Sequence, residues 1–318
     1  MSLLSVDDLK VFYPLRGSLF RRKKYLKAVN GVSFTLDAGE TLGLVGESGC
    51  GKSTLGRALV RLEKPCSGSI VLKGRDIAAL SGRELRQCRR DFQMIFQDPY
   101  GSLNPRLTVG SALLEVLKLH FPGEKTPALR ERAAVLLERV ALGADALDRY
   151  PHQFSGGQRQ RIGIARALAG DPAFIVADEP VSALDVSVQA AVVNLLMDIQ
   201  KESGTAFLFI AHDIAVVEHI SQRIMVMYLG KVMESAPAHE LVQNPRHPYT
   251  QALLSAVPVV GGDGRKRIVL QGDVPSPLNP PGGCPFHPRC PKARPECAEA
   301  LPPWIEKDGH GVGCFFPD

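Results

Sequence analysis

The sequence predicts an α/β fold, and three observations support this prediction. The glycine-rich stretch 46–54 follows an apolar run at 41–45 and precedes residues with helical spacing. Two further apolar runs of strand length, at 174–177 and 206–211, are each followed by charged or polar side chains. Residues from about 105 to 170 follow a helical pattern. Strands that alternate with helices in this way are typical of an α/β domain.

Composition is that of an ordinary folded protein. The chain has 318 residues, 45% of them hydrophobic and 22% charged, which is enough for one large or two modest cores. Its longest apolar runs are much shorter than the roughly 20 residues that cross a bilayer, and its first residues do not resemble a signal peptide. We therefore expect a cytosolic chain that only a partner holds at a membrane. The net charge of +5 does not by itself indicate nucleic-acid binding.

Two strands are expected at the start of the chain. Residues 1–12 alternate as a strand does, and a second strand at 28–36 ends at the turn 37–40, so an antiparallel sheet is predicted. Phe12 and Tyr13 stand where a ring could stack on an adenine or simply cover the core. The basic stretch 21–24 is expected to be a solvated loop, with contact to lipid or a partner as the alternative.

The glycine-rich stretch predicts a phosphate-binding loop. Gly46-Glu47-Ser48-Gly49-Cys50-Gly51-Lys52-Ser53-Thr54 fits the pattern G-x-x-x-x-G-K-[ST] in full. Its glycines allow a tight bend that points successive N–H groups inward at the start of a helix. Lys52 would neutralise the β- and γ-phosphates of a nucleotide, Ser53 would ligate Mg²⁺, and Thr54 would add a phosphate hydrogen bond. A plain glycine-rich turn is the alternative.

Beyond this loop, the pattern predicts more strands and a helical insertion. Strands are expected at 68–74 and 92–96, the second ending at Gln97-Asp98-Pro99. Within the helical stretch, Thr126-Pro127 opens a helix with proline in its first turn. A terminal hairpin is expected at 223–234, and the proline-rich residues 274–283 lead to a small appendage.

Polar groups follow several of these elements. Ser155-Gly156-Gly157-Gln158 stands at the start of a predicted helix, where N–H groups can meet phosphate. Asp178 and Glu179 end a buried strand, where one carboxylate can orient Mg²⁺ and the other can polarise a water. His212 ends the next strand, although a lone histidine at such a place is more often structural.

The order of these motifs is more restrictive than any one of them. Over residues 3 to about 255, the chain resembles an ABC-type ATPase. The resemblance rests on the following motifs in this order: the phosphate loop, Gln97, the stretch 155–158, Asp178-Glu179, Ser182-Ala183-Leu184-Asp185 and His212. The resemblance implies an ATPase domain at 1–255 and a separate tail at 256–318. Within the domain it implies a RecA-like parallel sheet core, an N-terminal antiparallel β subdomain and a helical subdomain at about 98–170.

The resemblance also implies roles for individual residues. Tyr13 would stack on the adenine, with Phe12 as the alternative if the strand register slips by one. Glu179 would be the general base, Gln97 would sense Mg²⁺ and the γ-phosphate, and His212 would clamp the γ-phosphate and the attacking water. ATP would also contact the phosphate loop and Asp178, and Mg²⁺ would be held by Ser53, Gln97 and Asp178. The opposite subunit of a dimer would supply Ser155, Gly156, Gly157, Gln158 and Asp185. Phe154 departs from the usual leucine of the family.

The C-terminal third narrows the resemblance. The chain resembles the ATPase subunits of bacterial dipeptide, oligopeptide and nickel importers at residues 96–105, 244–254 and 275–277 and at the cysteine-containing end. As a whole it most closely resembles the second, F-type subunit of a peptide permease. This implies an ATPase that powers peptide import from the cytoplasmic face of the inner membrane. The implied partners are a second ABC ATPase, two permease subunits that grip the region 98–106, and a solute-binding protein. A homodimer, a nickel importer and a soluble ABC ATPase acting on nucleic acid or the ribosome are alternatives.

Four of the seven cysteines lie in the last segment. Cys284, Cys290, Cys297 and Cys314 have the spacing C-x₅-C-x₆-C-x₁₆-C, which misses the short first interval usual in zinc sites. Four cysteines are the usual ligands of an iron–sulfur cluster. The resemblance implies a [4Fe–4S] cluster here, with zinc and no metal as alternatives and His287 as a bystander. Because these cysteines lie far in sequence from every ATP motif, we expect the cluster to have a structural or sensing role and no part in hydrolysis. The remaining cysteines, Cys50, Cys66 and Cys88, are expected to take no part.

Overall fold

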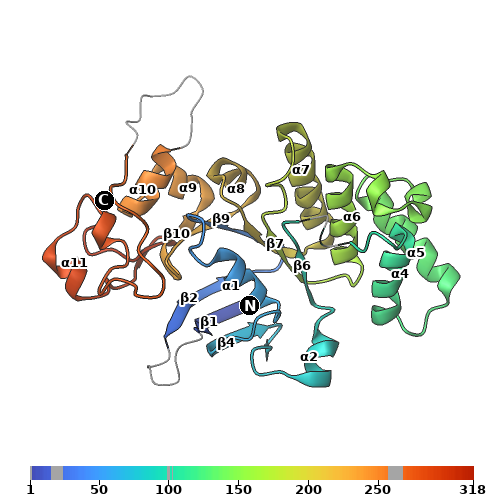
Figure 1. Cartoon of the computed structure of the whole chain (residues 1–318), viewed down its shortest axis with the longest axis horizontal. Helices are drawn as coiled ribbons and strands as arrows, with labels where there is room; N and C mark the ends of the chain where they lie inside the picture. Colours follow the sequence, from blue (N-terminus) through green and yellow to red (C-terminus); the bar gives the residue numbers. More distant parts are fainter. Residues whose placement is uncertain (1, 16–23, 99–100, 102, 257–267) are drawn as a thin grey trace. The chain divides into compact units, whose positions relative to one another are not determined.

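The chain forms two compact units. The computed structural model describes residues 2–15, 24–98, 101, 103–256 and 268–318 (Figure 1). The first unit comprises Met1–Leu36, Thr41–Ala79 and Ile210–Asp318, and the second comprises Asp37–Glu40 and Leu80–Phe209. Most of the predicted basic loop and residues 99, 100 and 102 of the segment expected to meet a permease lie outside the described residues.

An antiparallel sheet opens the first unit, as predicted. Its order is β2-β1-β4-β5, with β1 at Leu4–Pro14, β2 at Tyr25–Leu36, β4 at Ser67–Leu72 and β5 at Arg75–Asp76. Along β1, Leu4 and Val6 are buried, and then Leu9 and Val11. The register shifts between Val6 and Leu9, so a bulge restores the inward face after the alternation changes phase.

A second set of strands in this unit carries the phosphate loop. The order is β11-β12-β10-β9-β3, and β3 runs parallel to β9. All five residues of β3 are buried, as expected for a strand covered on both faces. The strands are β3 (Thr41–Val45), β9 (Arg223–Tyr228), β10 (Lys231–Pro237), β11 (Ile305–Lys307) and β12 (His310–Val312). The helices are α1 (Lys52–Leu59), α8 (Ile214–Ile220), α9 (Ala238–Gln243), α10 (Pro248–Ser255), the 3₁₀ turn η3 (His287–Arg289) and α11 (Pro295–Glu299).

The C-terminal tail extends this sheet. Strand β12 pairs antiparallel with β10, and β11 pairs with β12. The described tail residues therefore belong to the same compact unit as the phosphate loop. The proline-rich residues 274–283 form neither helix nor strand, as predicted.

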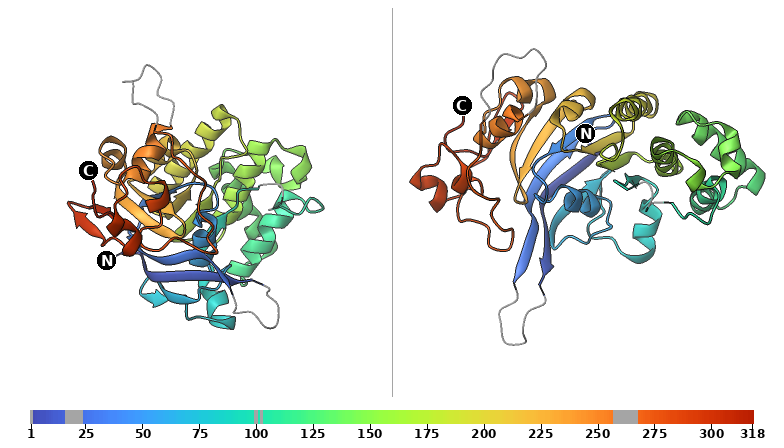
Figure 2. Two further views of the ribbon diagram at one scale, coloured as in Figure 1. Left: turned by 60° about the vertical axis from the view of Figure 1, so that its left-hand side comes forward. Right: turned by 45° about the horizontal axis from the view of Figure 1, so that its top comes forward.

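The second unit combines three strands with a helical insertion. Its strand order is β8-β7-β6, and β6 and β7 are parallel. Figure 2 shows α4 and α5, drawn in green, side by side, and the predicted proline is in the first turn of α5. The strands are β6 (Phe92–Ile95), β7 (Phe174–Asp178) and β8 (Ala206–Ile210). The helices are α2 (Gly82–Cys88), α4 (Val109–His120), α5 (Thr126–Arg139), η1 (Ala144–Asp148), η2 (Pro151–Gln153), α6 (Gly156–Leu168) and α7 (Val186–Ser203).

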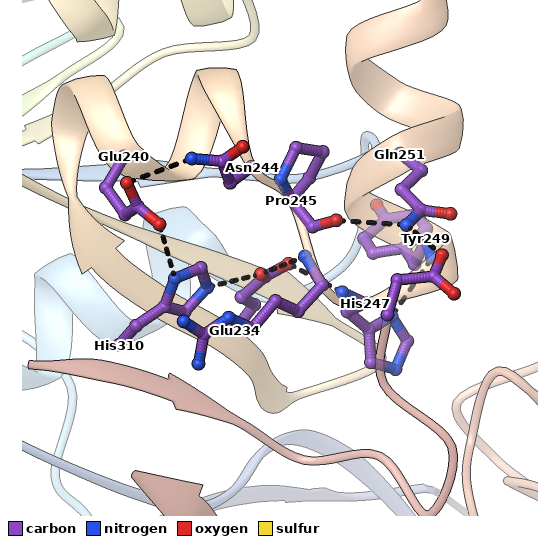
Figure 3. Close-up of polar contacts among 10 residues, drawn as sticks. Glu234, Glu240, Asn244, Pro245, His247, Tyr249, Gln251 and His310 are labelled. Carbon is purple, nitrogen blue, oxygen red and sulfur yellow. Dashed lines mark hydrogen bonds and ion pairs between the residues drawn. The ribbon is translucent and has the colours of Figure 1, made fainter. Parts of the chain in front are cut away.

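A buried carboxylate joins the tail to the rest of the first unit (Figure 3). Glu234 of β10 is fully buried, and its Oε1 accepts hydrogen bonds from His310 Nε2 at 2.7 Å and from the Arg246 N–H at 2.6 Å. Its Oε2 accepts from the His247 N–H at 3.1 Å. Buried carboxylates are tolerated only where such donors compensate for the lost water. This one carboxylate thus links β10, β12 and the start of α10.

His247 caps α10 as a neutral side chain. Burial lowers the pKa of His247 to about 3, so its ring keeps a free lone pair at neutral pH. Its Nδ1 accepts a hydrogen bond from the Tyr249 N–H at 3.0 Å. The cap sets the path of the helix that carries Tyr249 into the core.

We expect His310→Leu to lower the free energy of unfolding by about 3 kcal/mol, because it leaves the buried Glu234 carboxylate without one of its donors. Urea unfolding measures this change. His239→Leu is the matched control: the His239 side chain is 84% exposed and lies 3.8 Å from Glu218, so its loss should cost well under about 1 kcal/mol. Equal losses in the two variants would contradict the role of the buried pair.

Candidate functional site

The phosphate loop of the first unit connects β3 to α1 through three glycines whose backbone conformations other residues rarely adopt. Gly46, Gly49 and Gly51 have φ values of 153°, 77° and 108°. A Cβ on Gly51 would lie 2.1 Å from the Ala28 carbonyl oxygen, and one on Gly46 would lie 2.1 Å from the Met227 carbonyl oxygen. The loop is therefore closely packed between β2 and β9.

Lys52 lies folded along this loop. It is only 6% exposed, and its Nζ donates hydrogen bonds to the carbonyl oxygens of Gly46 at 2.7 Å and Glu47 at 3.1 Å. Helix α1 begins at Lys52, and Gly51 has no side chain to cap it. The positive end of the helix and the ammonium group thus meet at one place, which favours an anion.

Residues of the tail and of α10 hold Glu47 of the loop. The Tyr249 hydroxyl accepts a hydrogen bond from the Glu47 N–H at 2.9 Å. Arg289 Nη1 donates to Glu47 Oε2 at 2.8 Å and to the Tyr228 hydroxyl at 3.4 Å. Sequence reasoning missed these contacts, because the cysteine segment is far from the phosphate loop along the chain. The pairing of Glu47 with Arg289 can be recognised only when the fold is known.

Two further predicted residues belong to the first unit. Tyr13 of β1 is half-buried, burial raises its pKa, and its hydroxyl hydrogen-bonds with Thr54 and Glu63. The neighbouring Phe12 ring instead lies 6.0 Å from Lys27 Nζ. Tyr13 is thus the aromatic residue that contacts the helix after the phosphate loop. His212 follows β8 and is exposed.

In the second unit, the predicted base and the predicted sensor lie together. Asp178 is buried at the end of β7, and Glu179 follows it with a φ of 46°, which is uncommon for a residue other than glycine. Gln97, just beyond β6, donates a hydrogen bond from Nε2 to Glu179 Oε2 at 2.7 Å. Because β6 and β7 are adjacent and parallel, their carboxyl ends bring these two side chains together.

The stretch 155–158 forms the start of α6. Ser155 Oγ accepts from the Gln158 N–H at 3.3 Å, while the Ser155 N–H donates to Gln158 Oε1 at 3.0 Å, so the two residues form a capping box. Both side chains are exposed. Gly157 is buried where a Cβ would lie 2.3 Å from the Val188 side chain, which lets α6 and α7 approach closely.

Two further residues of the predicted motifs, Phe154 and Asp185, differ in burial. Phe154 is buried, and the Arg149 guanidinium lies 4.2 Å from the centre of its ring, so the aromatic residue packs in place of the usual leucine. Asp185 is exposed at the start of α7.

The four tail cysteines gather in one region of the first unit. Cys284 and Cys297 are buried, Cys290 and Cys314 are half-buried, and the Cys284 N–H donates to the Cys297 carbonyl at 2.8 Å. Burial raises the pKa of Cys284 to about 11 and also raises the pKa values of Cys290 and Cys314, with the neighbouring thiols adding to the shifts. Within the described ranges, no three His, Cys, Asp or Glu side chains converge as metal ligands would.

In the part of the chain that the structure describes, no helix has both the length and the apolar character to cross a membrane.

Comparison with protein families gives two matches. Residues 29–182 match the ABC transporter family, and residues 233–297 match the family described as "Oligopeptide/dipeptide transporter, C-terminal region". The first match contains the phosphate loop, Gln97, the stretch 155–158 and Glu179. The second contains the start of the tail and three of its four cysteines.

Similar proteins cover nearly the whole chain. The oligopeptide transport ATP-binding protein AppF of Bacillus subtilis is 55% identical over 99% of this chain and 97% of its own length. The probable peptide ABC transporter ATP-binding protein y4tS of Sinorhizobium fredii is 52% identical over 98% of this chain and 89% of its own length. Almost the whole chain therefore aligns with these relatives.

Solved structures agree with this relationship. The ATP-binding cassette MJ0796, in a dimeric post-hydrolysis state bound to ADP and phosphate, has a TM-score of 0.66, 29% identity, and coverage of 74% of this chain and 98% of its own. The cbiO1 protein of Clostridium perfringens, part of an ABC transporter complex, has a TM-score of 0.66 and is 26% identical. The match covers 76% of this chain and 91% of cbiO1. With its phosphate loop, its Gln97–Glu179 pair and these relatives, the chain belongs to the ABC transporter family of ATP-binding ATPases.

Proposed function

We propose that this chain is the ATP-hydrolysing subunit of a membrane importer for dipeptides or oligopeptides. The observation that carries the proposal is that one chain joins an ABC ATPase region to a C-terminal region of the oligopeptide/dipeptide transporter type. Relatives named for oligopeptide and peptide transport match both regions together. A nickel or other small-solute importer is the alternative within the same family.

A soluble ABC ATPase acting on nucleic acid or the ribosome is less well supported. ABC ATPases of DNA repair carry a long coiled coil inside the domain, whereas the longest described helix here, α7, has 18 residues. A C-terminal region of the oligopeptide/dipeptide transporter type would also serve no purpose in such a protein.

We assign nucleotide binding to the residues that the sequence motifs predict. Tyr13 takes the adenine, and the loop 46–54 takes the phosphates, with Lys52 supplying positive charge. Mg²⁺, when bound with the nucleotide, neutralises phosphate charge, and Ser53, Gln97 and Asp178 are the residues that would hold it. Their donors are all oxygen atoms, which is the ligand type that Mg²⁺ prefers.

Hydrolysis is assigned to the carboxylate of Glu179. Gln97 donates to Glu179 Oε2 at 2.7 Å, which orients the carboxylate before any water arrives. Glu179 then accepts a proton from the water that attacks the γ-phosphorus, and the γ-phosphate leaves ADP as inorganic phosphate. His212, exposed beyond β8, would clamp the γ-phosphate and the attacking water.

The stretch 155–158 is assigned to a nucleotide on an opposite subunit. Ser155 and Gln158 are exposed, and their capping box fixes the start of α6 while leaving its positive end at the surface. Asp185 would act with this stretch to link two active sites. Two ATP molecules would close such a dimer, and hydrolysis would open it, which moves the membrane subunits.

Glu179→Gln should abolish ATP turnover in the assembled complex, with a loss of at least about 100-fold. Nucleotide binding should remain, because the amide keeps the shape of the side chain and leaves the phosphate loop intact. Lys52→Ala is the contrasting variant and should lose nucleotide instead. Steady-state phosphate release and ATP retention on the purified complex measure the two effects, and turnover equal to that of wild type in Glu179→Gln would exclude Glu179 as the base.

We propose that this chain pairs with a second, different ABC ATPase and that the pair binds two permease subunits. The complex would lie at the cytoplasmic face of the inner membrane. A solute-binding protein would deliver the cargo to the permease. Relatives named as oligopeptide transport and peptide ABC transporter ATP-binding proteins support the permease partners. A homodimer of this chain is the alternative for the ATPase pair.

Native mass measurement of the detergent-extracted complex should give one copy of this chain, one copy of another ATPase and two membrane subunits. Two copies of this chain with no second ATPase would contradict the heterodimer and weaken the peptide-permease assignment. The Glu179→Gln variant with ATP provides the matched sample, because it should hold the ATPase pair together.

We also propose that Cys284, Cys290, Cys297 and Cys314 hold a [4Fe–4S] cluster. Burial raises the pKa values of Cys284, Cys290 and Cys314, and neighbouring tail thiols add to these shifts. A bound cation would offset the cost of deprotonating such thiols, and a cluster needs four of them. The cysteines do not converge as they stand, so binding would have to draw them together. Zinc is the alternative cation.

Protein purified without oxygen should be brown and should lose its colour in Cys290→Ser, because a cluster needs its thiolate ligands. The double variant Cys66→Ser, Cys88→Ser is the control and should keep the colour. Visible absorption together with iron and zinc analysis decides the matter. A colourless protein containing one zinc would replace the cluster with a zinc site.

A further inference from the structure

We propose that Arg289, in the cysteine-rich tail, is a positioning residue for the phosphate loop. It holds and neutralises the Glu47 carboxylate, and through this contact the tail sets how tightly the loop binds ATP. The inference rests on the proposed role of the loop in binding phosphates.

The contact has the geometry of an effective ion pair. Arg289 Nη1 and Glu47 Oε2 are 2.8 Å apart, and the two side chains are only 10% and 24% exposed. Solvent and salt screen a partly buried pair much less than a pair at the surface. The pair therefore differs from exposed ones such as Arg130–Asp148, whose side chains are 48% and 73% exposed.

Glu47 is held at two points. Its N–H donates to the Tyr249 hydroxyl at 2.9 Å, while its carboxylate accepts from Arg289. Both partners lie far along the chain from the loop. Together they fix the main chain and the side chain of a residue that directly precedes the phosphate-binding N–H groups.

The turn that carries Arg289 is anchored in the core. Phe286 is fully buried, and its ring centre lies 5.4 Å from that of Tyr228 and 5.2 Å from that of Tyr249. The Arg289 N–H donates to the Phe286 carbonyl at 3.0 Å. The guanidinium is thus presented to Glu47 from a rigid support.

Electrostatics explain why the loop needs this arginine. Glu47 is an anion inside a loop whose ligand is a polyphosphate, so an unpaired carboxylate at this position would repel the ligand. Arg289 cancels that charge and limits the movement of the side chain. Its loss should weaken ATP binding more than it slows the chemical step, because Gln97 and Glu179 do not depend on this contact.

The test measures ATP affinity by titrating Mg-ATP onto the full-length chain that carries Glu179→Gln, so that hydrolysis does not interfere. Arg289→Met should raise the dissociation constant about tenfold, and Arg289→Lys, which keeps the charge, should raise it less. In a Glu47→Gln background, Arg289→Met should change the dissociation constant by less than about twofold, because the amide carries no charge to neutralise.

Arg294→Met is the matched control within the tail. The Arg294 guanidinium stacks 4.0 Å from the centre of the Phe316 ring, so this variant disturbs tail packing without touching the loop. It should leave ATP affinity unchanged. A separate measurement of kcat and KM in the variants without Glu179→Gln should show the effect of Arg289→Met mainly in KM.

Two results would overturn the proposal: an equal loss of affinity for Arg289→Met with and without Glu47→Gln, or an equal loss in Arg294→Met. Either would mean that Arg289 supports only the tail. If Arg289→Met does not fold, the comparison of Arg289→Lys in the two backgrounds decides in the same way. Failure of the parent chain to bind ATP would instead reject the proposed role of the phosphate loop.

Discussion

The close packing of the phosphate loop between two strands is the constraint on which the first unit depends. Carbonyl oxygens of Ala28 and Met227 stand where a Cβ on Gly51 or Gly46 would have to lie. The Cys50 carbonyl also accepts a hydrogen bond from the Gly230 N–H at 2.8 Å. A loop held this tightly presents its N–H groups in a fixed direction, so little ordering remains to be done when an anion binds.

The tail takes part in the same constraint. Glu234 fixes β12 and the start of α10 to β10, and α10 then supplies the Tyr249 hydroxyl that contacts the loop. Arg289 adds a second contact from the cysteine segment. The C-terminal region that distinguishes this chain from a minimal cassette is therefore joined to the phosphate loop through buried polar contacts.

The residues proposed for hydrolysis are ordered in a different way. In the second unit, Glu179 follows a buried strand with a left-handed backbone, and Gln97 from the adjacent strand holds its carboxylate. The backbone strain is offset by the packing of two parallel strands. By contrast, Ser155 and Gln158 are ordered by their own capping box and remain exposed, which is compatible with the proposed contact to an opposite subunit.

By itself the sequence determined the main features that depend on neighbours along the chain. The phosphate loop, the capped stretch 155–158, the strand before Asp178 and the helix opened by Thr126-Pro127 are local patterns of turn chemistry and periodicity, and all were predicted. The importer-type tail was predicted from motifs that are also contiguous. Such features need no knowledge of the fold.

Only the tertiary structure decided the choice of contacts between distant residues. The register of β1 shifts between Val11 and Phe12, so strand alternation did not select Tyr13 over Phe12 as the neighbour of Thr54. Strands β11 and β12 have three residues each, too few for a periodic signal. Glu47 and Arg289 are separated by 242 positions, and their pairing follows from the burial of Phe286 and Glu234. Periodicity reports which face of an element is buried, whereas the partner it meets is set by the packing of the whole unit.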